Sequence, residues 1–498
     1  MALFRSEYQI GRGEAPESRL EAPFFAFFMI VSAFGLLIFH LVFQNENWTI
    51  AMSISAVIFA ITLVRVDFGV YFLVVAMLLS PEIGAGAVGR GQRELNVRYD
   101  DVLIIVVFLG VLVKQGFEGR QSFWRPSPVN AGIAAYYGVC VFSTLLAWRA
   151  SLPAWDKRVA LFVMLKMAEF YMVFFLVGNA IRDLRQVRRQ LGLFFIVAMI
   201  VSAYGLMTMG TEERIGAPFE RGGTEPNTLG GYLTLVVCIA TGLLINAPTR
   251  GKRLLCMLVI ASAFVPFLFT LSRASYIALL VALVTLSIVG RRIIIFVSVV
   301  AILVLSPVLM PPDVQDRVNY TFQRGSGVPL VLGGWDTGRQ VDKSTYERIY
   351  VWRKVRHTLR VWPLRGGGVA WGTVLDSQYA RVLIETGLLG LAAFLFLQYR
   401  LLRSLRQSYR WTEDWFGRGL GMGAFAATIG LIAHSLGTIT FLIVRIMEPY
   451  WFIVALAMVV RSVAMEKHFQ RVSAQRQAQN DHQRTVRPVL SPPQPSRP

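Results

Sequence analysis

Apolar runs close to the length of a membrane span recur along most of this chain, and they limit its fold more than any other feature. A helix needs about 20 apolar residues to cross a bilayer. The chain is 55% hydrophobic and 16% charged, whereas a soluble protein has roughly 25% charged residues. We therefore expect an all-α, polytopic membrane bundle of about 14 transmembrane helices, within a range of roughly 12 to 14. The expected spans lie at 23–43, 49–64, 68–80, 101–114, 129–146, 159–180, 191–208, 226–245, 254–269, 275–289, 293–309, 377–398, 419–436 and 439–460.

Basic residues in the connecting loops indicate the orientation, because cytoplasmic loops of membrane proteins are enriched in lysine and arginine. Alternate short loops differ in basic residues by about two to one, and the richer side also carries both termini. We expect both termini in the cytoplasm. Residues 1–22 are then an N-terminal arm, spans 1–11 fill 23–309, spans 12–14 fill 377–460, and the polar residues 461–498 are a disordered tail.

The net charge of +20 reports this topology first. No basic soluble domain with interleaved aromatic residues is present, which argues against a nucleic-acid partner. The three cysteines lie inside apolar runs and lack metal-ligand spacing. No HExxH, GxSxG or P-loop pattern occurs. We expect no metal and no cofactor.

The stretch 310–376 is a long, arginine-rich polar segment between spans, and it is expected outside the cytoplasm against the charge bias. Taken as a helix, 346–362 has two stripes. The apolar stripe holds Trp352, Val355, Leu359 and Trp362, and the basic stripe holds Arg353, Arg356, His357 and Arg360. Such an amphipathic helix lies flat at a membrane surface or caps a bundle. The basic stripe contacts acidic headgroups in one interpretation and guides a substrate in the other.

Three arginines outside the basic stripe point to an anionic ligand. Arg348 projects one turn before Trp352 on the apolar stripe, and a partly buried guanidinium needs an anionic partner. Arg273 lies between two short spans, either binding a partner at depth or snorkelling from a helix end. Arg221 and Asn227 bracket a Gly-rich turn where the next helix opens, and helix N-termini suit phosphate oxygens.

Polar residues near the outer ends of the last spans allow structural interpretations too. Arg445 and Glu448 are i,i+3 neighbours, which form an internal ion pair or contact the substrate. His434 is typical of a hydrogen-bonded packing group. Asp376 begins the helix after the long loop, where it serves as an N-cap or as a general base on a sugar hydroxyl.

Four segments resemble the O-antigen ligase and polymerase superfamily in order and spacing. They are RGGTEPNTLGGYL, LSRASYIALLVAL, RIYVWRKVRHTLRVWPLRGGGVAWG and DSQYARVLIETGLLGLAAFL, within residues 215–400. The resemblance implies a metal-independent glycosyltransferase of the bacterial inner membrane, acting at the periplasmic face on undecaprenyl-diphosphate-linked oligosaccharide. It also implies a glycan or lipid acceptor and, as partners, a flippase and a chain-length regulator.

In this resemblance Arg221 and Arg273 match diphosphate-binding arginines, and Arg348 and Trp352 match an Arg-x-x-x-Trp stretch. Family ligases commonly open the helix after the loop with His-Asn, whereas this chain has Asp376-Ser377. That departure favours a polymerase-like member with Asp376 as the base. Two alternatives stay open: a lipid-linked oligosaccharide flippase, and an inactive scaffold subunit of a polysaccharide export complex. The sugar and its linkage are not encoded in any recognisable pattern.

Overall fold

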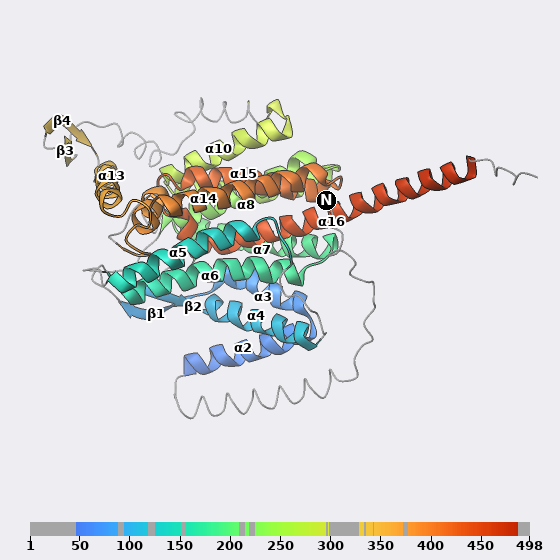
Figure 1. Ribbon diagram of the computed structural model, residues 1–498, viewed down its shortest axis with the longest axis horizontal. Helices are drawn as coiled ribbons and strands as arrows, with labels where there is room; N and C mark the ends of the chain where they lie inside the picture. Colours follow the sequence, from blue (N-terminus) through green and yellow to red (C-terminus); the bar gives the residue numbers. More distant parts are fainter. Residues whose placement is uncertain are drawn as a thin grey trace, which may run out of the picture.

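The computed structural model describes residues 46–87, 94–117, 125–150, 155–208, 215–218, 225–294, 297, 328–332, 335–341, 343–371 and 377–486. Twelve long helices in these ranges form one elongated bundle (Figure 1). They are α2 (Glu46–Val64), α3 (Val66–Leu79), α4 (Tyr99–Phe117), α5 (Asn130–Ala150), α6 (Lys157–Ala180), α7 (Leu184–Met207), α8 (Pro226–Asn246), α9 (Arg250–Phe269), α10 (Arg273–Gly290), α14 (Gln378–Trp411), α15 (Trp415–His434) and α16 (Val444–Val486).

Within the described ranges, nine helices are long and apolar enough to cross a membrane. The chain therefore has the architecture of a helical, multi-pass membrane protein. The twelve helices coincide with the second to tenth and the last three of the expected spans. The expected span at 23–43 lies outside the described residues, and the one at 293–309 lies almost wholly outside them.

Local sequence signals set several helix starts. Asp183 caps α7 through a reciprocal pair of hydrogen bonds with Gln186, so that two backbone N–H groups at the helix start find partners. Asp156 accepts from two backbone N–H groups at the start of α6. These caps place the polar residues at helix ends and leave the apolar runs to form the spans.

The central helices of the bundle are α8 and α16. Their membrane-length stretches are the most buried of the nine, with 89% and 83% of residues inside the protein. Gly242 of α8 lies against Gly419 and Gly423 of α15, and a Cβ at Gly242 would overlap the Gly419 carbonyl oxygen. Small residues let membrane helices approach closely and so gain packing contacts.

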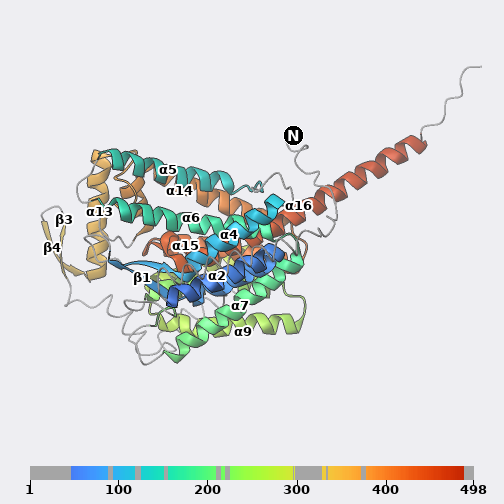
Figure 2. The ribbon, with the colours of Figure 1, turned by 90° about the horizontal axis from the view of Figure 1, so that it is seen from below.

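The amphipathic helix α13 (Lys343–Val361) lies across one end of the bundle instead of along it (Figure 2). Val351 and Val355 are buried against Ala380, Leu383 and Ile384 of α14. The residues expected on the basic stripe are all exposed, as predicted: Arg353, Arg356, His357 and Arg360.

The predicted apolar stripe of α13 is wrong in one position. Trp352 is 50% exposed, while Val351 and Thr358 are buried with Val355. Packing against α14 selects this face, and it is rotated from the stripe that hydropathy alone selects. An exposed indole at the end of a membrane bundle suits the bilayer interface, where tryptophan is enriched.

Two short antiparallel hairpins lie in loops at the same end as α13 (Figure 1). The first pairs β1 (Glu82–Ala87) with β2 (Glu94–Arg98), and the second pairs β3 (Val328–Leu332) with β4 (Trp335–Val341). The predicted all-α class is confirmed for the bundle, and the strands of the described residues are confined to these two loop hairpins. The segment ELNVR alternates apolar and polar residues, as a half-buried strand does.

The segment after α13 returns to the bundle and docks on a break in α14. Gly387 interrupts the helix with a φ of 65°. The N–H groups of Gly367 and Gly368 donate to the carbonyls of Ile384 and Glu385 at 2.9 and 2.8 Å. The glycines of PLRGGG thus allow two backbones to approach each other and fix the position of α13 relative to α14.

The helix α16 continues well beyond its membrane-length stretch and projects from the opposite end of the bundle (Figure 2). The prediction that the chain is disordered from residue 461 is wrong as far as Val486. The extension is rich in Gln, Arg and Ala, which are good helix formers, and the preceding span supplies the helix nucleus. Arg471 in this extension forms an exposed ion pair with Glu413 at 2.6 Å.

Candidate functional site

Several helices begin at the end of the bundle that α13 covers, and four of these starts lie close together. They are the starts of α8, α10, α14 and α16, and α15 ends among them. Hydrogen bonds join these termini: the Ser272 hydroxyl donates to the Asn227 side chain at 2.7 Å, and the Gln378 N–H donates to the Ser435 carbonyl at 3.0 Å. The Gln378 side chain in turn accepts from the Phe441 N–H at 3.2 Å. Helix N-termini present N–H groups and the positive ends of their dipoles, which favour anions. We call this region the mouth.

A buried chain of polar side chains crosses the mouth. Ser272 lies 2.8 Å from Ser275, and Ser275 lies 3.0 Å from Nε2 of His434. Nδ1 of His434 lies 2.8 Å from the Thr440 hydroxyl. Both ring nitrogens are therefore occupied and the ring is fully buried. This arrangement fits the interpretation of His434 as a hydrogen-bonded packing group, which joins α10, α15 and the segment before α16.

Two arginines of the candidate set come from helix starts at the mouth. Arg273 is the first residue of α10 and is partly buried. Arg445 is the second residue of α16, is 3% exposed, and donates to the carbonyl of Pro218. Arg445 thus ties the 215–218 segment to α16.

The predicted internal ion pair between Arg445 and Glu448 does not form in the described chain. Arg445 turns toward Pro218, and neither carboxylate oxygen of Glu448 has a hydrogen-bond partner. One turn separates the two residues along α16, and they face different surroundings. Glu448 instead lies beside two aspartates of α4.

The remaining candidate residues are placed only in part. Arg221 and Asp376 lie outside the described residues. Arg348 belongs to α13 by its backbone, and the side chains of α13 are described from Val351 onward. Arg356 and Arg360 are exposed on α13. Of the three arginines expected to hold a diphosphate, the structure thus places the side chain of Arg273 alone, at the mouth.

A buried cluster of charged groups, which sequence reasoning missed, lies near the start of α16. Arg98, at the end of β2, forms an ion pair with Asp100 at 2.9 Å and donates to the Met77 carbonyl at 2.8 Å. The Ser80 hydroxyl donates to Asp100 at 2.8 Å. The backbone N–H of Arg98 donates to Asp101 at 2.9 Å. Contacts from the Arg98 side chain, the Arg98 backbone and Ser80 therefore fix the turn between β2 and α4.

Lys166 of α6 completes the cluster from another helix. Its ammonium group pairs with Asp101 and, at 3.2 Å, with Glu169. Carboxylate oxygens of Asp100, Asp101 and Glu448 all lie within 4.8 Å of one another. We call these residues, with Arg98, Lys166 and Glu169, the charge cluster.

The charge cluster has more acids than bases. It holds four carboxyl groups against one guanidinium and one ammonium, and its members are buried. Like charges this close cannot all ionise without compensation. Asp100 pairs with Arg98 and Asp101 with Lys166, whereas Glu448 forms no ion pair with a described residue.

The sequence carried a signal for this cluster. Lys166 and Glu169 lie inside the expected span at 159–180, and Asp100 and Asp101 come at the start of the one at 101–114. Ionisable residues within spans are costly, so each is a functional hypothesis by default. What the sequence does not show is that α4, α6 and α16 bring them together.

A second buried ion pair positions the segment after α13. Arg381 and Glu385 of α14 pair at 2.7 Å, and the same Glu385 oxygen accepts from the Ala370 N–H at 2.9 Å. The Ser143 hydroxyl donates to the Glu385 carbonyl at 2.7 Å. These contacts make Glu385 a junction between α5, α14 and the segment after α13.

Comparison of the chain with protein-family models and with curated proteins finds no match.

Proposed function

We propose that the chain is a membrane glycosyltransferase that transfers or polymerises glycans carried on undecaprenyl diphosphate. In this proposal it crosses the bacterial inner membrane fourteen times, with both termini in the cytoplasm. The mouth, α13 and the rest of 310–376 then face the periplasm. The resemblance of four sequence segments to the O-antigen ligase and polymerase superfamily motivates the proposal.

The structural observation that best supports a glycosyltransferase is the arrangement of helix starts at the mouth. The starts of α8, α10, α14 and α16 lie together there, and Arg273 and Arg445 come from the first turns of α10 and α16. The helix α13, with its exposed basic residues, lies across the same end (Figure 2). Such a region is suited to a diphosphate, because guanidinium groups bind phosphate oxygens in bidentate fashion and backbone N–H groups add to the field. It also lies at the membrane end, where a lipid-linked substrate arrives from the bilayer.

The proposed reaction is a single displacement at the mouth. The acceptor hydroxyl oxygen attacks the anomeric carbon, and the bond from that carbon to the diphosphate oxygen breaks. The diphosphate leaves with the bonding electron pair, and Arg273, with Arg221 and Arg348, stabilises the charge that develops. Asp376 takes the hydroxyl proton as general base. Its neighbour Ser377 is the N-cap of α14 at the mouth.

The test is transfer by purified protein supplied with an undecaprenyl-diphosphate oligosaccharide. Arg273→Gln removes one guanidinium at the mouth, and we expect it to lower the transfer rate by roughly 100-fold or more, as loss of a transition-state donor does. Arg292→Gln removes an exposed arginine just after the far end of the same helix and should leave the rate unchanged. Equal rates for both variants and the native protein would contradict the proposed role of the mouth.

The charge cluster favours a second function, a lipid-linked oligosaccharide carrier. Carriers place ionisable groups inside the membrane and use them to couple transport to protons. Reconstitution into liposomes separates the two functions. A carrier moves the labelled lipid between leaflets and leaves every glycosidic bond intact, whereas the enzyme lengthens or transfers the glycan.

A further inference from the structure

A pocket at the end of the bundle opposite the mouth has the chemistry of an anion site. The helices α10 and α14 start at the mouth and α15 ends there, so the last turns of α10 and α14 and the first turn of α15 meet at the other end. There they border a half-open pocket of about 550 Å³. It is lined by Ile288, Val289, Gly290, Arg291, Arg406, Tyr409, Arg410, Arg418 and Phe425.

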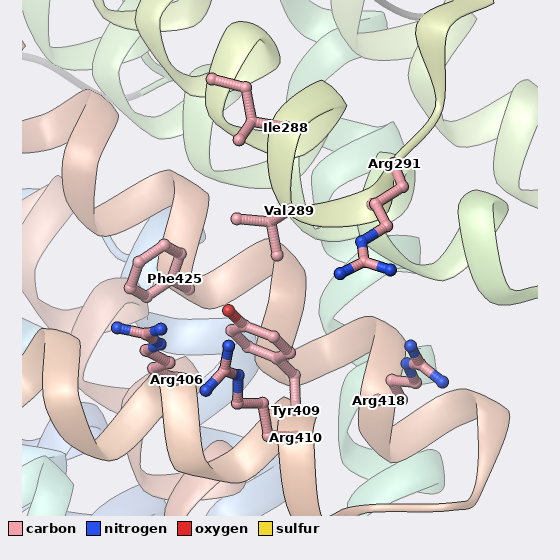
Figure 3. Close-up of a pocket in the computed structure, with 9 residues that line it drawn as sticks. Ile288, Val289, Arg291, Arg406, Tyr409, Arg410, Arg418 and Phe425 are labelled. Atoms are coloured by element: carbon pink, nitrogen blue, oxygen red, sulfur yellow. The ribbon is translucent and has the colours of Figure 1, made fainter.

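Four arginines from three elements surround this pocket. Figure 3 shows Arg291 on one side of the space and Arg406, Arg410 and Arg418 on the other. Their side chains form no hydrogen bond and no ion pair with the part of the chain that the structure describes, and no acidic residue of that part lines the pocket. Four guanidinium groups this near one another repel, and an anion between them would relieve that repulsion.

The two acids in the turn between α14 and α15 pair with arginines that do not line the pocket. Asp414 pairs with Arg188 at 2.7 Å and Glu413 pairs with Arg471 at 2.6 Å. These two carboxylates are therefore occupied, and the four arginines that line the pocket are available to an external anion. The four arginines are exposed and lie around a half-open pocket, which an anion can enter from outside the bundle.

The pocket also has an apolar wall. Ile288 is 71% exposed, and Val289 and Phe425 lie beside it (Figure 3). Aromatic packing of Tyr409 on Phe425, with ring centroids 5.8 Å apart, closes one side. An anion with an attached hydrocarbon chain would satisfy both walls at once, and free phosphate would satisfy only the basic one.

We infer that this pocket binds the phosphate-bearing headgroup of an anionic lipid from the adjacent leaflet. Basic pockets between membrane helices recognise such headgroups by combining charge with depth at the interface. The arginines hold the phosphate, the Tyr409 hydroxyl donates to it, and Ile288 and Val289 contact the chains. The site is separate from the mouth and does not depend on the proposed transfer reaction.

The test is lipid binding by the full-length protein in neutral detergent, followed by native mass spectrometry. The probes are phosphatidylglycerol, phosphatidylcholine of the same chain length, and inorganic pyrophosphate. The variant Arg291→Gln/Arg406→Gln removes one pocket arginine from each side. The matched control Arg292→Gln/Arg403→Gln removes the same charge beside them, from residues that do not line the pocket.

Phosphatidylglycerol should bind in preference to phosphatidylcholine, and the pocket variant should weaken its binding roughly 30-fold, while the control variant binds like the native protein. Equal weakening in both variants would mean that surface charge alone attracts the lipid, which overturns the inference. Binding of pyrophosphate with no preference for phosphatidylglycerol would overturn the lipid assignment. Thermal unfolding of each variant checks that the bundle remains folded.

Discussion

Replacing Lys166 with methionine should destabilise the protein strongly. The lysine is buried and pairs with Asp101 and, at 3.2 Å, with Glu169. Methionine fills a similar volume without the charge, so the loss is electrostatic more than steric. Removing one partner of a buried ion pair costs about 3–5 kcal/mol. Because two carboxylates lose their partner here, we expect a loss near the upper end, about 4–5 kcal/mol.

The opposite result is expected for Glu448→Gln, although it also alters the charge cluster. Glutamine has the shape of the buried glutamate, whose oxygens have no hydrogen-bond partner. The Glu448 carboxylate lies within 4.8 Å of those of Asp100 and Asp101, and two like charges at about 5 Å repel by about 3 kcal/mol at an effective dielectric constant of roughly 20. The substitution should therefore leave the stability unchanged or raise it by up to about 3 kcal/mol. In the double variant it should recover part of the loss caused by Lys166→Met.

Thermal unfolding in detergent, followed by tryptophan fluorescence, measures both variants under one condition. Lys157→Met is the matched control, because it makes the same substitution at the exposed start of the same helix. The excess of carboxyl groups would be refuted if Glu448→Gln lowered the unfolding temperature as much as Lys166→Met. A Lys166→Met variant as stable as the control would refute the buried pairing.

Three further perturbations test other parts of the structure. Gly366→Ala should lower the free energy of unfolding by about 2 kcal/mol or more, because φ is +66° and a Cβ would lie 2.5 Å from the Glu385 backbone. Gly138→Ala, at a position with open space around it, should not destabilise the protein in the same unfolding assay. His434→Ala should cost about 2–4 kcal/mol by leaving two buried hydroxyl groups without their partner. The hydrogen bond from Arg471 holds the pKa of Glu413 below its usual range. The stabilisation by this ion pair is therefore fully present above the unfolded carboxyl pKa of about 4.3. It is lost as the pH falls through the lower pKa of Glu413 in the folded protein. In a plot of unfolding temperature against pH, Glu413→Gln should remove this part of the pH dependence.

The spans themselves are predictable from sequence because each depends on local composition. An apolar run of membrane length must satisfy its own backbone hydrogen bonds and therefore forms a helix wherever it lies. Composition alone predicts α5–α10 and α14–α16 in this way, and recognisable caps such as Asp183 mark helix starts among them. That argument fails beyond residue 461, because helix propensity in a polar extension depends on the span that precedes it.

The buried face of α13 shows where periodicity stops being sufficient. Trp352 and Val351 differ by one position, and both are apolar enough to mark a stripe. The choice between them is made by Leu383 and Ile384 of α14, which are more than 30 positions away in the chain. A short amphipathic helix with mixed residues has two acceptable faces, and the surface it meets selects one.

The candidate site also has one part that the sequence predicts and another that it does not. Arg273 is predictable because a charge between two short spans must lie near a membrane end. Its neighbour Ser272 contacts Asn227 of α8 and Ser275 of α10, and no local pattern encodes the approach of these two helices. The charge cluster is a clearer case. Asp101, Lys166 and Glu448 are far apart along the chain, so only the assembled bundle brings them into one cluster.

The most direct test of the central claim is a single-turnover assay in detergent with undecaprenyl-diphosphate oligosaccharide whose lipid and glycan carry different isotopic labels. In a micelle there is no second leaflet, so transport cannot produce a signal. We expect each glycosidic bond formed to release one undecaprenyl diphosphate, and Arg273→Gln to slow the formation of both products equally. Intact substrate after prolonged incubation with folded protein and acceptor would contradict it.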